Sequence, residues 1–233
     1  MKSPLTPAVV DSPENPSQIS TLCGRNGKRV WIAAWFCIGI ILIYFDSTIQ
    51  PYLMAFGHDP TMRSIAEHWQ DLGATLGIVS FLIVGLVASR RDHYQTFITF
   101  ALAISAAGAA VQIVKHLIGR ARPDSVHDQT HFYGPFGMLY HGPKIQMDSM
   151  PSGHTTAAFA MAVALAYHWP RLAPLWFFLA AGVAVARTLV NRHFPSDVVV
   201  ASGFGTVIGW AICAARAHHV AKLHVVSQEN SED

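Results

Sequence analysis

Six long apolar segments constrain the fold of this chain more than any other feature. A membrane-spanning helix needs about 20 apolar residues, with a range of about 17–25. The first and fourth segments are short by this measure, but each can extend by a few residues into its flanks. A single soluble core would not bury six such segments, so the pattern predicts an all-α bundle of six transmembrane helices. The segments cover residues 30–45, 72–88, 96–114, 155–169, 173–190 and 198–215.

The overall composition agrees with an integral membrane protein. Charged residues make up 13% of the chain and hydrophobic residues 52%, whereas a soluble domain carries about 25% charged residues. The formal net charge of +2 is small and the basic residues form no run or stripe, which argues against a nucleic-acid partner. The three cysteines, at positions 23, 37 and 213, are too widely spaced for a zinc pattern or a disulfide framework.

The chain divides into one membrane domain and two tails. Residues 1–28 are rich in Pro, Ser, Asn and Asp and show no apolar periodicity, which predicts a disordered cytoplasmic tail. Residues 29–218 contain the six apolar segments, and residues 219–233 form a second cytoplasmic tail. Glycine and alanine are frequent at 101–110 and 180–186, and such small residues let membrane helices approach closely. We therefore expect these two faces to pack inside the bundle.

The distribution of basic residues predicts how the helices are oriented. Arg25, Lys28 and Arg29 precede the first segment, which places the N-terminus in the cytoplasm by the positive-inside rule. Six spans return the C-terminus to the same side. Residues 60–70 have the pattern of a short amphipathic helix lying on the outer interface. The loops expected on the outer side are 46–71, 115–150 and 191–197.

Three short charged stretches adjoin the apolar segments. In the predicted topology all three lie on the outer face of the membrane: one follows the third segment, one opens the fourth and one follows the fifth. Charged side chains beside membrane helices are costly and usually have a function. The stretches are Lys115 with Arg122-Pro123, then Pro151-Ser152-Gly153-His154, and then Arg187 with His193 and Asp197.

The first two stretches have the chemistry of an anion-binding site. Lys115 and Arg122 are seven residues apart, so on a helix they project from nearly the same face and repel each other unless an anion lies beside them. Ser152 is placed to cap the helix of the fourth segment, where free N–H groups attract an anion and Gly153 lets it approach. His154 follows in the first turn. Taken alone, the first stretch also fits a snorkelling pair of cations at a helix end. The second stretch alone also fits a capped helix with an incidental histidine.

The third stretch adds a nucleophile. His193 and Asp197 are four residues apart, a spacing at which the carboxylate can accept a hydrogen bond from one ring nitrogen and leave the other free to attack. Arg187 supplies a planar fork for bidentate phosphate binding. An interfacial salt bridge is the simpler alternative for this stretch alone, but the three stretches together favour one phosphate site.

The same residues resemble the three motifs of the type 2 phosphatidic acid phosphatase family, which shares its site with the vanadium haloperoxidases. The family motifs K-x6-R-P, P-S-G-H and S-R-x5-H-x3-D match the stretches from Lys115 to Asp197. One position departs, because Ala186 stands where the family has a serine whose hydroxyl helps to bind phosphate. The resemblance implies a membrane lipid phosphatase that needs no metal and no other cofactor.

The resemblance also implies a role for each residue. His193 attacks phosphorus and forms a phosphohistidine, and Asp197 orients it. His154 first protonates the leaving oxygen and then activates water. The phosphate oxygens are held by three cationic side chains and two backbone amides. These are the side chains of Lys115, Arg122 and Arg187, and the amides of Ser152 and Gly153.

The expected substrate is a lipid phosphate that enters from the bilayer, and the expected location is the bacterial inner membrane with the site facing the periplasm. Polyprenyl pyrophosphate and phosphatidyl phosphates are the first candidates, and lipid A phosphate is compatible. The loop 123–150 is expected to cover the site and select the head group. Transfer of the phosphate to another lipid, a vanadium haloperoxidase and a non-enzymatic membrane protein stay as alternatives, and the sequence leaves the oligomeric state open.

Overall fold

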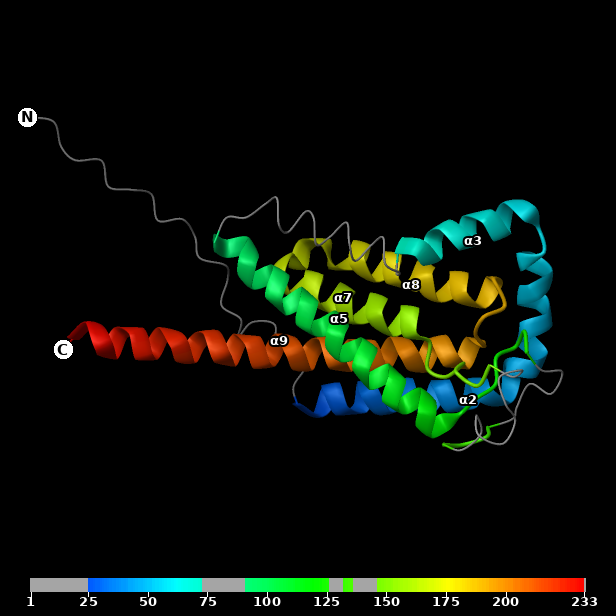
Figure 1. Ribbon diagram of the computed structural model, residues 1–233, viewed down its shortest axis with the longest axis horizontal. Coiled ribbons are helices and arrows are strands. Elements are labelled where there is room, and N and C mark those ends of the chain that lie inside the picture. The colour runs from blue at the N-terminus through cyan, green and yellow to red at the C-terminus, as the bar shows by residue number, and fades with distance from the viewer. Residues whose placement is uncertain (1–24, 73–90, 126–131, 136–145, 233) are drawn as a thin grey trace, which may run out of the picture.

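The computed structural model describes residues 25–72, 91–125, 132–135 and 146–232. Over these residues the chain is almost entirely helical, and its β-structure is limited to one isolated bridge between Arg120 and Phe132. The elements are α2 (Arg25–Gly57), α3 (Pro60–Leu72), α5 (Arg91–Ile118), α7 (Gly153–His168), the short 3₁₀ helix η1 (Pro170–Leu172), α8 (Ala173–Leu189) and α9 (Pro195–Glu232). Figure 1 shows α7, α8, α9 and the first part of α2 along one axis, with α5 crossing them obliquely and α3 at one end.

Four of the described helices are long and apolar enough to cross a membrane, which confirms the all-α membrane class. The helix of the predicted fourth span, α7, has 16 residues and is shorter than these four. The predicted second span, 72–88, lies outside the described residues after Leu72. The count of six spans therefore stays a prediction. The four candidate spans are Arg29–Gly57, Thr96–Ile118, Pro170–Leu189 and Pro195–Lys222.

The surface of these helices is suited to lipid. Large apolar side chains point outward along α2 and α8; Ile40 and Phe178 are each 64% exposed. Such side chains would be unfavourable in water over a whole bundle surface, but the hydrocarbon core of a bilayer solvates them. The outward side chains and the span lengths together indicate an integral membrane protein.

Helix α2 is longer than its apolar segment predicts. It begins at Arg25, inside the predicted tail, and continues past residue 45 to Gly57. The sequence suggests an end at Asp46 because a carboxylate is costly in a membrane helix, but the side chain of Asp46 is fully buried and paired. The loop expected over 46–71 is thus mostly helix: α2 bends in the part that contains Pro51 (Figure 1), and α3 then confirms the predicted short amphipathic helix.

The centre of the bundle is α9, which packs against α2, α5, α7 and α8. The small residues of the sequence do lie at the helix contacts: Ala103 and Ala107 of α5 are fully buried in one cluster with Ala160 of α7. Gly205 allows α9 to approach α7 closely, because a Cβ there would lie 2.3 Å from the carbonyl oxygen of Thr156. Beyond the bundle α9 continues as a helix through most of the predicted C-terminal tail.

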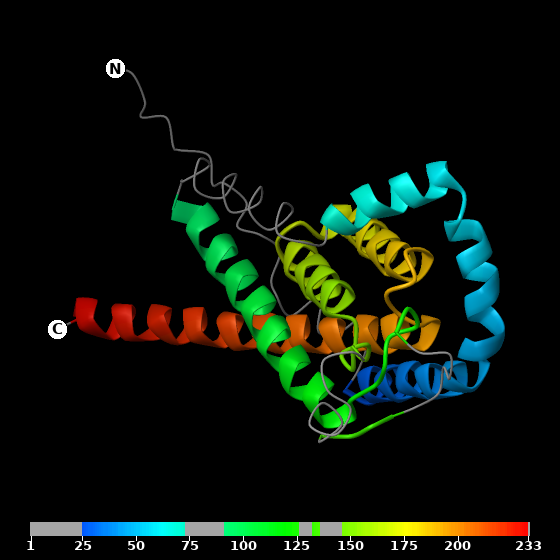
Figure 2. The same ribbon diagram turned by 45° about the vertical axis from the view of Figure 1, so that its right-hand side comes forward.

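The helix ends that carry the charged stretches meet at one end of the bundle. Figures 1 and 2 show the C-terminal ends of α5 and α8 together with the N-terminal ends of α7 and α9 on the same side, where α2 bends towards α3. The three stretches therefore gather at one end of the bundle, and their position on the outer side of the membrane stays a prediction. The far side of the bundle holds the C-terminal end of α9.

Candidate active site

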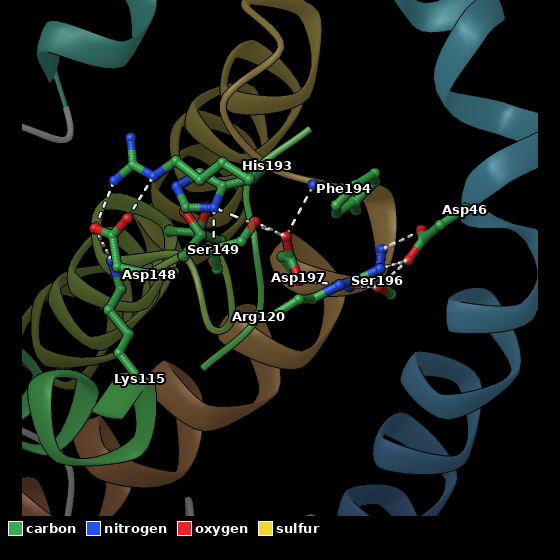
Figure 3. Close-up of polar contacts among 12 residues, drawn as sticks. Asp46, Lys115, Arg120, Asp148, Ser149, His193, Phe194, Ser196 and Asp197 are labelled. Carbon is green, nitrogen blue, oxygen red and sulfur yellow. Dashed lines mark hydrogen bonds and ion pairs between the residues drawn. The ribbon is translucent and has the colours of Figure 1, made fainter. Parts of the chain in front are cut away.

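Each predicted site residue lies at or just beyond a helix end. Lys115 is in the last turn of α5, Ser152 immediately precedes α7, and Arg187 is in the last turn of α8. His193 lies in the short connection from α8 to α9, and Asp197 is in the first turn of α9. Helix ends offer unpaired backbone groups and partial charges. The fold therefore converts helix termini into one polar cluster at the rim of an apolar bundle (Figure 3).

The first two cations of the cluster are held together by a carboxylate that the motifs do not include. Asp148 accepts hydrogen bonds from Nε and Nη2 of Arg122, each at 2.7 Å, and Nζ of Lys115 lies 3.5 Å from the same carboxylate. This contact relieves the repulsion between the two cations that their spacing predicts. Asp148 lies three residues before the P-S-G-H motif, and sequence reasoning assigned it no role.

Arg187 has a different partner, also missed from the sequence. Its Nη1 donates to Oε1 of Gln70 at 2.5 Å, which ties the end of α8 to the amphipathic helix α3. The side chain is only 7% exposed. Its buried Nε has no hydrogen-bond partner among the described residues. A buried guanidinium N–H without an acceptor is costly, and an oxygen of a phosphate group is a suitable acceptor for it.

His193 is oriented by a backbone carbonyl instead of by the expected carboxylate. Its Nδ1 lies 2.7 Å from the carbonyl oxygen of Ser149, whereas the nearest oxygen of Asp197 is 3.9 Å away. The predicted direct hydrogen bond to Asp197 is thus replaced by the contact with Ser149. A carbonyl oxygen only accepts, so Nδ1 carries the proton and Nε2 keeps its lone pair. The function expected of the carboxylate, fixing the tautomer, is performed by the loop before α7.

Asp197 is fully buried and its carboxylate is held by three donors. Its Oδ2 accepts from the hydroxyl of Ser149 at 2.5 Å and from the backbone N–H of Phe194 at 2.9 Å. Its Oδ1 accepts from Nη1 of Arg120 at 2.6 Å. Ser149 therefore contacts both Asp197, through its hydroxyl, and His193, through its carbonyl, and links the two predicted catalytic residues (Figure 3).

Arg120 is the largest fully buried polar side chain of the site and was not predicted. Its Nη2 donates to Asp46 of α2 at 2.7 Å, and its Nη1 also donates to the hydroxyl of Ser196 at 2.6 Å. The guanidinium lies over the ring of Phe194, 4.2 Å from the ring centre. Asp46 in addition accepts from the backbone and the hydroxyl of Ser196. The signal in the sequence was Asp46 itself, a carboxylate directly after an apolar segment.

The start of α7 leaves its backbone donors available. Ser152 occupies the N-cap position with an extended backbone, but its side chain makes no capping hydrogen bond, contrary to the prediction. Its hydroxyl instead accepts from the hydroxyl of Thr155 at 3.1 Å. The first N–H groups of α7 therefore keep their capacity to bind an anion. A Cβ at Gly153 would meet only the side chain of Val111, at 3.7 Å, so packing leaves room on this side.

The cations set the protonation of the groups around them. Burial, followed by the charges of Arg187 and Lys115, lowers the pKa of His193 well below its ordinary value. The same causes lower the pKa of His154 to about 4. Both rings are therefore neutral at pH 7. Burial alone would raise the pKa of Asp148, but hydrogen bonds from Arg122 and the charge of Lys115 hold it below its ordinary value, so this residue is ionised.

Ala186, the one departure from the family motif, packs against apolar side chains. It is 3% exposed and lies in a cluster with Ala66 of α3, Val190 and the partly buried Trp69 and Leu189. A serine hydroxyl at this position would enter apolar surroundings.

The fold and the site together define a class: an all-α integral membrane protein with a cationic cluster beside a buried, neutral histidine. The chain belongs to the PAP2 superfamily, whose family model matches residues 96–220. That match contains all the residues predicted for the site.

Individual relatives agree with this assignment. A lipid A 1-phosphatase of Rhizobium etli is 36% identical over 121 residues, which cover 50% of this chain and 49% of the relative. The chain thus spans about half the length of that curated relative. The fold resembles the crystal structure of Aquifex aeolicus LpxE, with a TM-score of 0.55, 21% identity and coverage of 71% of this chain and 92% of that one. A PAP2-type phosphatidylglycerolphosphate phosphatase from Bacillus subtilis gives a TM-score of 0.57 at 19% identity, with coverage of 80% and 96%.

Proposed function

We propose that this protein is a metal-independent lipid phosphatase that hydrolyses the terminal phosphomonoester or pyrophosphate group of a lipid. The reaction passes through a phosphohistidine. The observation that carries the proposal is the state of His193. Its Nδ1 proton is directed to the carbonyl of Ser149, so the lone pair of Nε2 is available for attack. Three cations lie close enough to lower its pKa, and the same cations can hold phosphate oxygens.

The proposed reaction has two displacements. In the first, the lone pair of His193 Nε2 forms a bond to phosphorus while the bond to the leaving oxygen breaks, and that oxygen takes a proton from His154. In the second, His154 takes a proton from water, the resulting hydroxide attacks phosphorus, and the P–N bond breaks to release phosphate. Lys115, Arg122 and Arg187 balance the charge on the phosphate oxygens throughout.

Asp197 acts in this scheme through its neighbours. His193 becomes positively charged when Nε2 binds phosphorus, and a carboxylate 3.9 Å from Nδ1 stabilises that charge. The hydrogen bond from Ser149 to Asp197 also fixes the position of the carbonyl that holds the ring. We therefore assign Asp197 to electrostatic stabilisation and positioning.

The proposed location is the bacterial inner membrane, with the site on the periplasmic side of six spans. The convergence of the motif-bearing helix ends at one end of the bundle supports one-sided access. The amphipathic helix α3 at that end suits the interface between lipid and water. The site would then receive a phosphate head group while the lipid chains stay beside the apolar helices.

The substrate candidates all carry a terminal phosphate. Names of relatives point to lipid A phosphate and to phosphatidylglycerophosphate, and polyprenyl pyrophosphate has the same chemistry. We propose that the loop 123–150 selects among them; its residues 126–131 and 136–145 lie outside the described part of the chain. Transfer of phosphate from His193 to a second lipid is the alternative outcome of the same chemistry.

Phosphate release by the purified full chain tests the proposal. The protein is assayed in detergent with excess EDTA against the lipid phosphates above, beside His193→Ala. We expect release in EDTA by the wild type and a loss of several orders of magnitude in the variant, with the thermal unfolding temperature little changed. Activity that chelation abolishes and magnesium restores would overturn the metal-independent mechanism. Activity of His193→Ala within about tenfold of the wild type would overturn the nucleophile.

A further inference from the structure

Asp148 places a negative charge where the proposed function needs a phosphate. Its two carboxylate oxygens receive Nε and Nη2 of Arg122, each at 2.7 Å, and Nζ of Lys115 lies 3.5 Å away. This fork-to-fork contact is the one that an arginine makes with two oxygens of a phosphate group. The donors that face Asp148 cannot serve a phosphate at the same time.

We infer that Asp148 is an internal competitor for the phosphate site that admits terminal phosphates and excludes phosphodiester head groups. This inference rests on the proposed function, because it concerns which lipids reach His193. A substrate phosphate takes Arg122 and Lys115 from the Asp148 carboxylate. Only an anion that binds these cations better than a carboxylate does can enter.

The surroundings of Asp148 allow it to leave. Its side chain is 39% exposed, whereas that of Asp197 is fully buried. It lies in the non-helical stretch 146–150, so a rotation of the side chain disturbs no helix. Once released, the carboxylate can be solvated by water, and its desolvation cost is recovered. Asp197, with three donors and no exposure, has no such alternative.

Charge decides which head groups compete successfully. The site has three positive charges, from Lys115, Arg122 and Arg187, and one negative charge, from Asp148. Its net charge is therefore +2. A phosphomonoester carries about −1.5 to −2 at neutral pH, and a pyrophosphate carries more, so either gains on replacing a single carboxylate charge. A phosphodiester carries one negative charge and gains nothing. Bilayers consist largely of phosphodiester lipids, and three uncompensated cations at their surface would bind them.

Inhibition by a phosphodiester lipid tests this inference. The full chain hydrolyses a short-chain lipid phosphomonoester in micelles of an uncharged detergent, and phosphatidylglycerol is added as the competitor. Asp148→Asn keeps the shape of the side chain and removes its charge. We expect the inhibitory concentration of phosphatidylglycerol to be at least about tenfold lower for this variant than for the wild type. This factor corresponds to the loss of about one charge-assisted hydrogen bond. Asp148→Glu, which retains the charge, is expected to behave like the wild type.

Asp124→Asn is the matched control, because it removes the same charge from the same loop. Asp124 pairs with Arg192 at 2.9 Å, outside the set of three cations. Phosphatidylglycerol inhibition in this variant should equal that of the wild type. If Asp148→Asn is inhibited no more strongly than the wild type, or if it binds both lipids more weakly, Asp148 positions Arg122 instead and the inference is wrong. Asp148→Ser replaces the asparagine variant if that one does not fold.

A binding measurement separates this inference from the proposed function. The rise in unfolding temperature on adding phosphatidylglycerol or the phosphomonoester reports binding without turnover. One outcome is that the wild type hydrolyses no lipid phosphate while Asp148→Asn is stabilised by lower concentrations of phosphatidylglycerol than the wild type. That result would reject the proposed phosphatase function and support the role of Asp148 as a competitor. Hydrolysis together with equal stabilisation of both proteins would reject the role of Asp148 and support the phosphatase function.

Discussion

His154 shows how a single residue depends on the charge around it. Burial and the charges of Arg187 and Lys115 lower its pKa to about 4, so the ring is neutral at pH 7. The proposed reaction needs a proton on His154 to protonate the leaving oxygen. An anionic substrate among the cations opposes their effect and favours the charged ring. We infer that substrate binding itself supplies the protonation state that the first step needs.

Binding of molybdate, a dianion with no proton to exchange at neutral pH, should therefore be accompanied by proton uptake. The pKa of His154 is depressed before binding, and the bound dianion is expected to raise it, so the affinity for the dianion should increase as the pH is lowered from 7 to about 6. Titration calorimetry in two buffers of different ionisation enthalpy measures the uptake. His154→Gln should bind molybdate with most of the uptake removed. Binding without uptake in the wild type would show that the ring stays neutral.

At the scale of elements, Arg120 connects helix α2 to the catalytic end of α9. Its guanidinium joins Asp46 of α2 to Asp197 and Ser196 of α9, at distances of 2.6 to 2.7 Å. The planar guanidinium donates to a carboxylate of each helix and also lies over the ring of Phe194. The first membrane helix is thus fixed to the site by a buried ion pair as well as by apolar packing.

Arg120→Lys should weaken this connection, because an ammonium group cannot reach two carboxylates with the geometry of the fork. The loss of one hydrogen bond to a charged group predicts a decrease in the free energy of unfolding of about 1.5–3 kcal/mol. The same substitution at Arg192, whose ion pair with Asp124 is partly exposed, should cost less than about 1 kcal/mol. Denaturation in detergent compares the two. If both substitutions lowered the free energy of unfolding equally, the buried network would stabilise the protein no more than an exposed ion pair does.

At the scale of the whole molecule, the charged stretches lie at one end of the bundle, where α7 and α9 begin, and the C-terminal end of α9 lies at the other (Figures 1 and 2). The basic flank before the first span predicts an N-terminus in the cytoplasm. With the proposed six spans, the polar end would then face the periplasm.

Cysteine labelling tests this orientation. The native cysteines are first replaced by serine, and a cysteine is introduced either at Ser125, beside the site, or at Lys222, near the end of α9. A membrane-impermeant thiol reagent added to intact cells, or to spheroplasts if there is an outer membrane, should label Ser125→Cys. It should label Lys222→Cys only after lysis. The reverse pattern would place the site in the cytoplasm.

The sequence by itself determined the helical membrane class and most of the residues that form the polar cluster. Long apolar segments leave the backbone no alternative to helix in a bilayer. Charged motifs at the ends of these segments located Lys115, Arg122, Arg187, His193 and Asp197, and the fold does bring them together. Local spacing carries this information because helix ends lie where the apolar segments end.

Only the tertiary structure decided the partners of these residues. The contact between Ser149 and His193, the pairing of Asp148 with Arg122, and the bond from Gln70 to Arg187 join residues from 26 to 117 positions apart. Burial then removes water as a competing partner, so each charge must find a protein group, and which group it finds depends on how the helices pack. The sequence shows which residues carry charge, but not which two will meet.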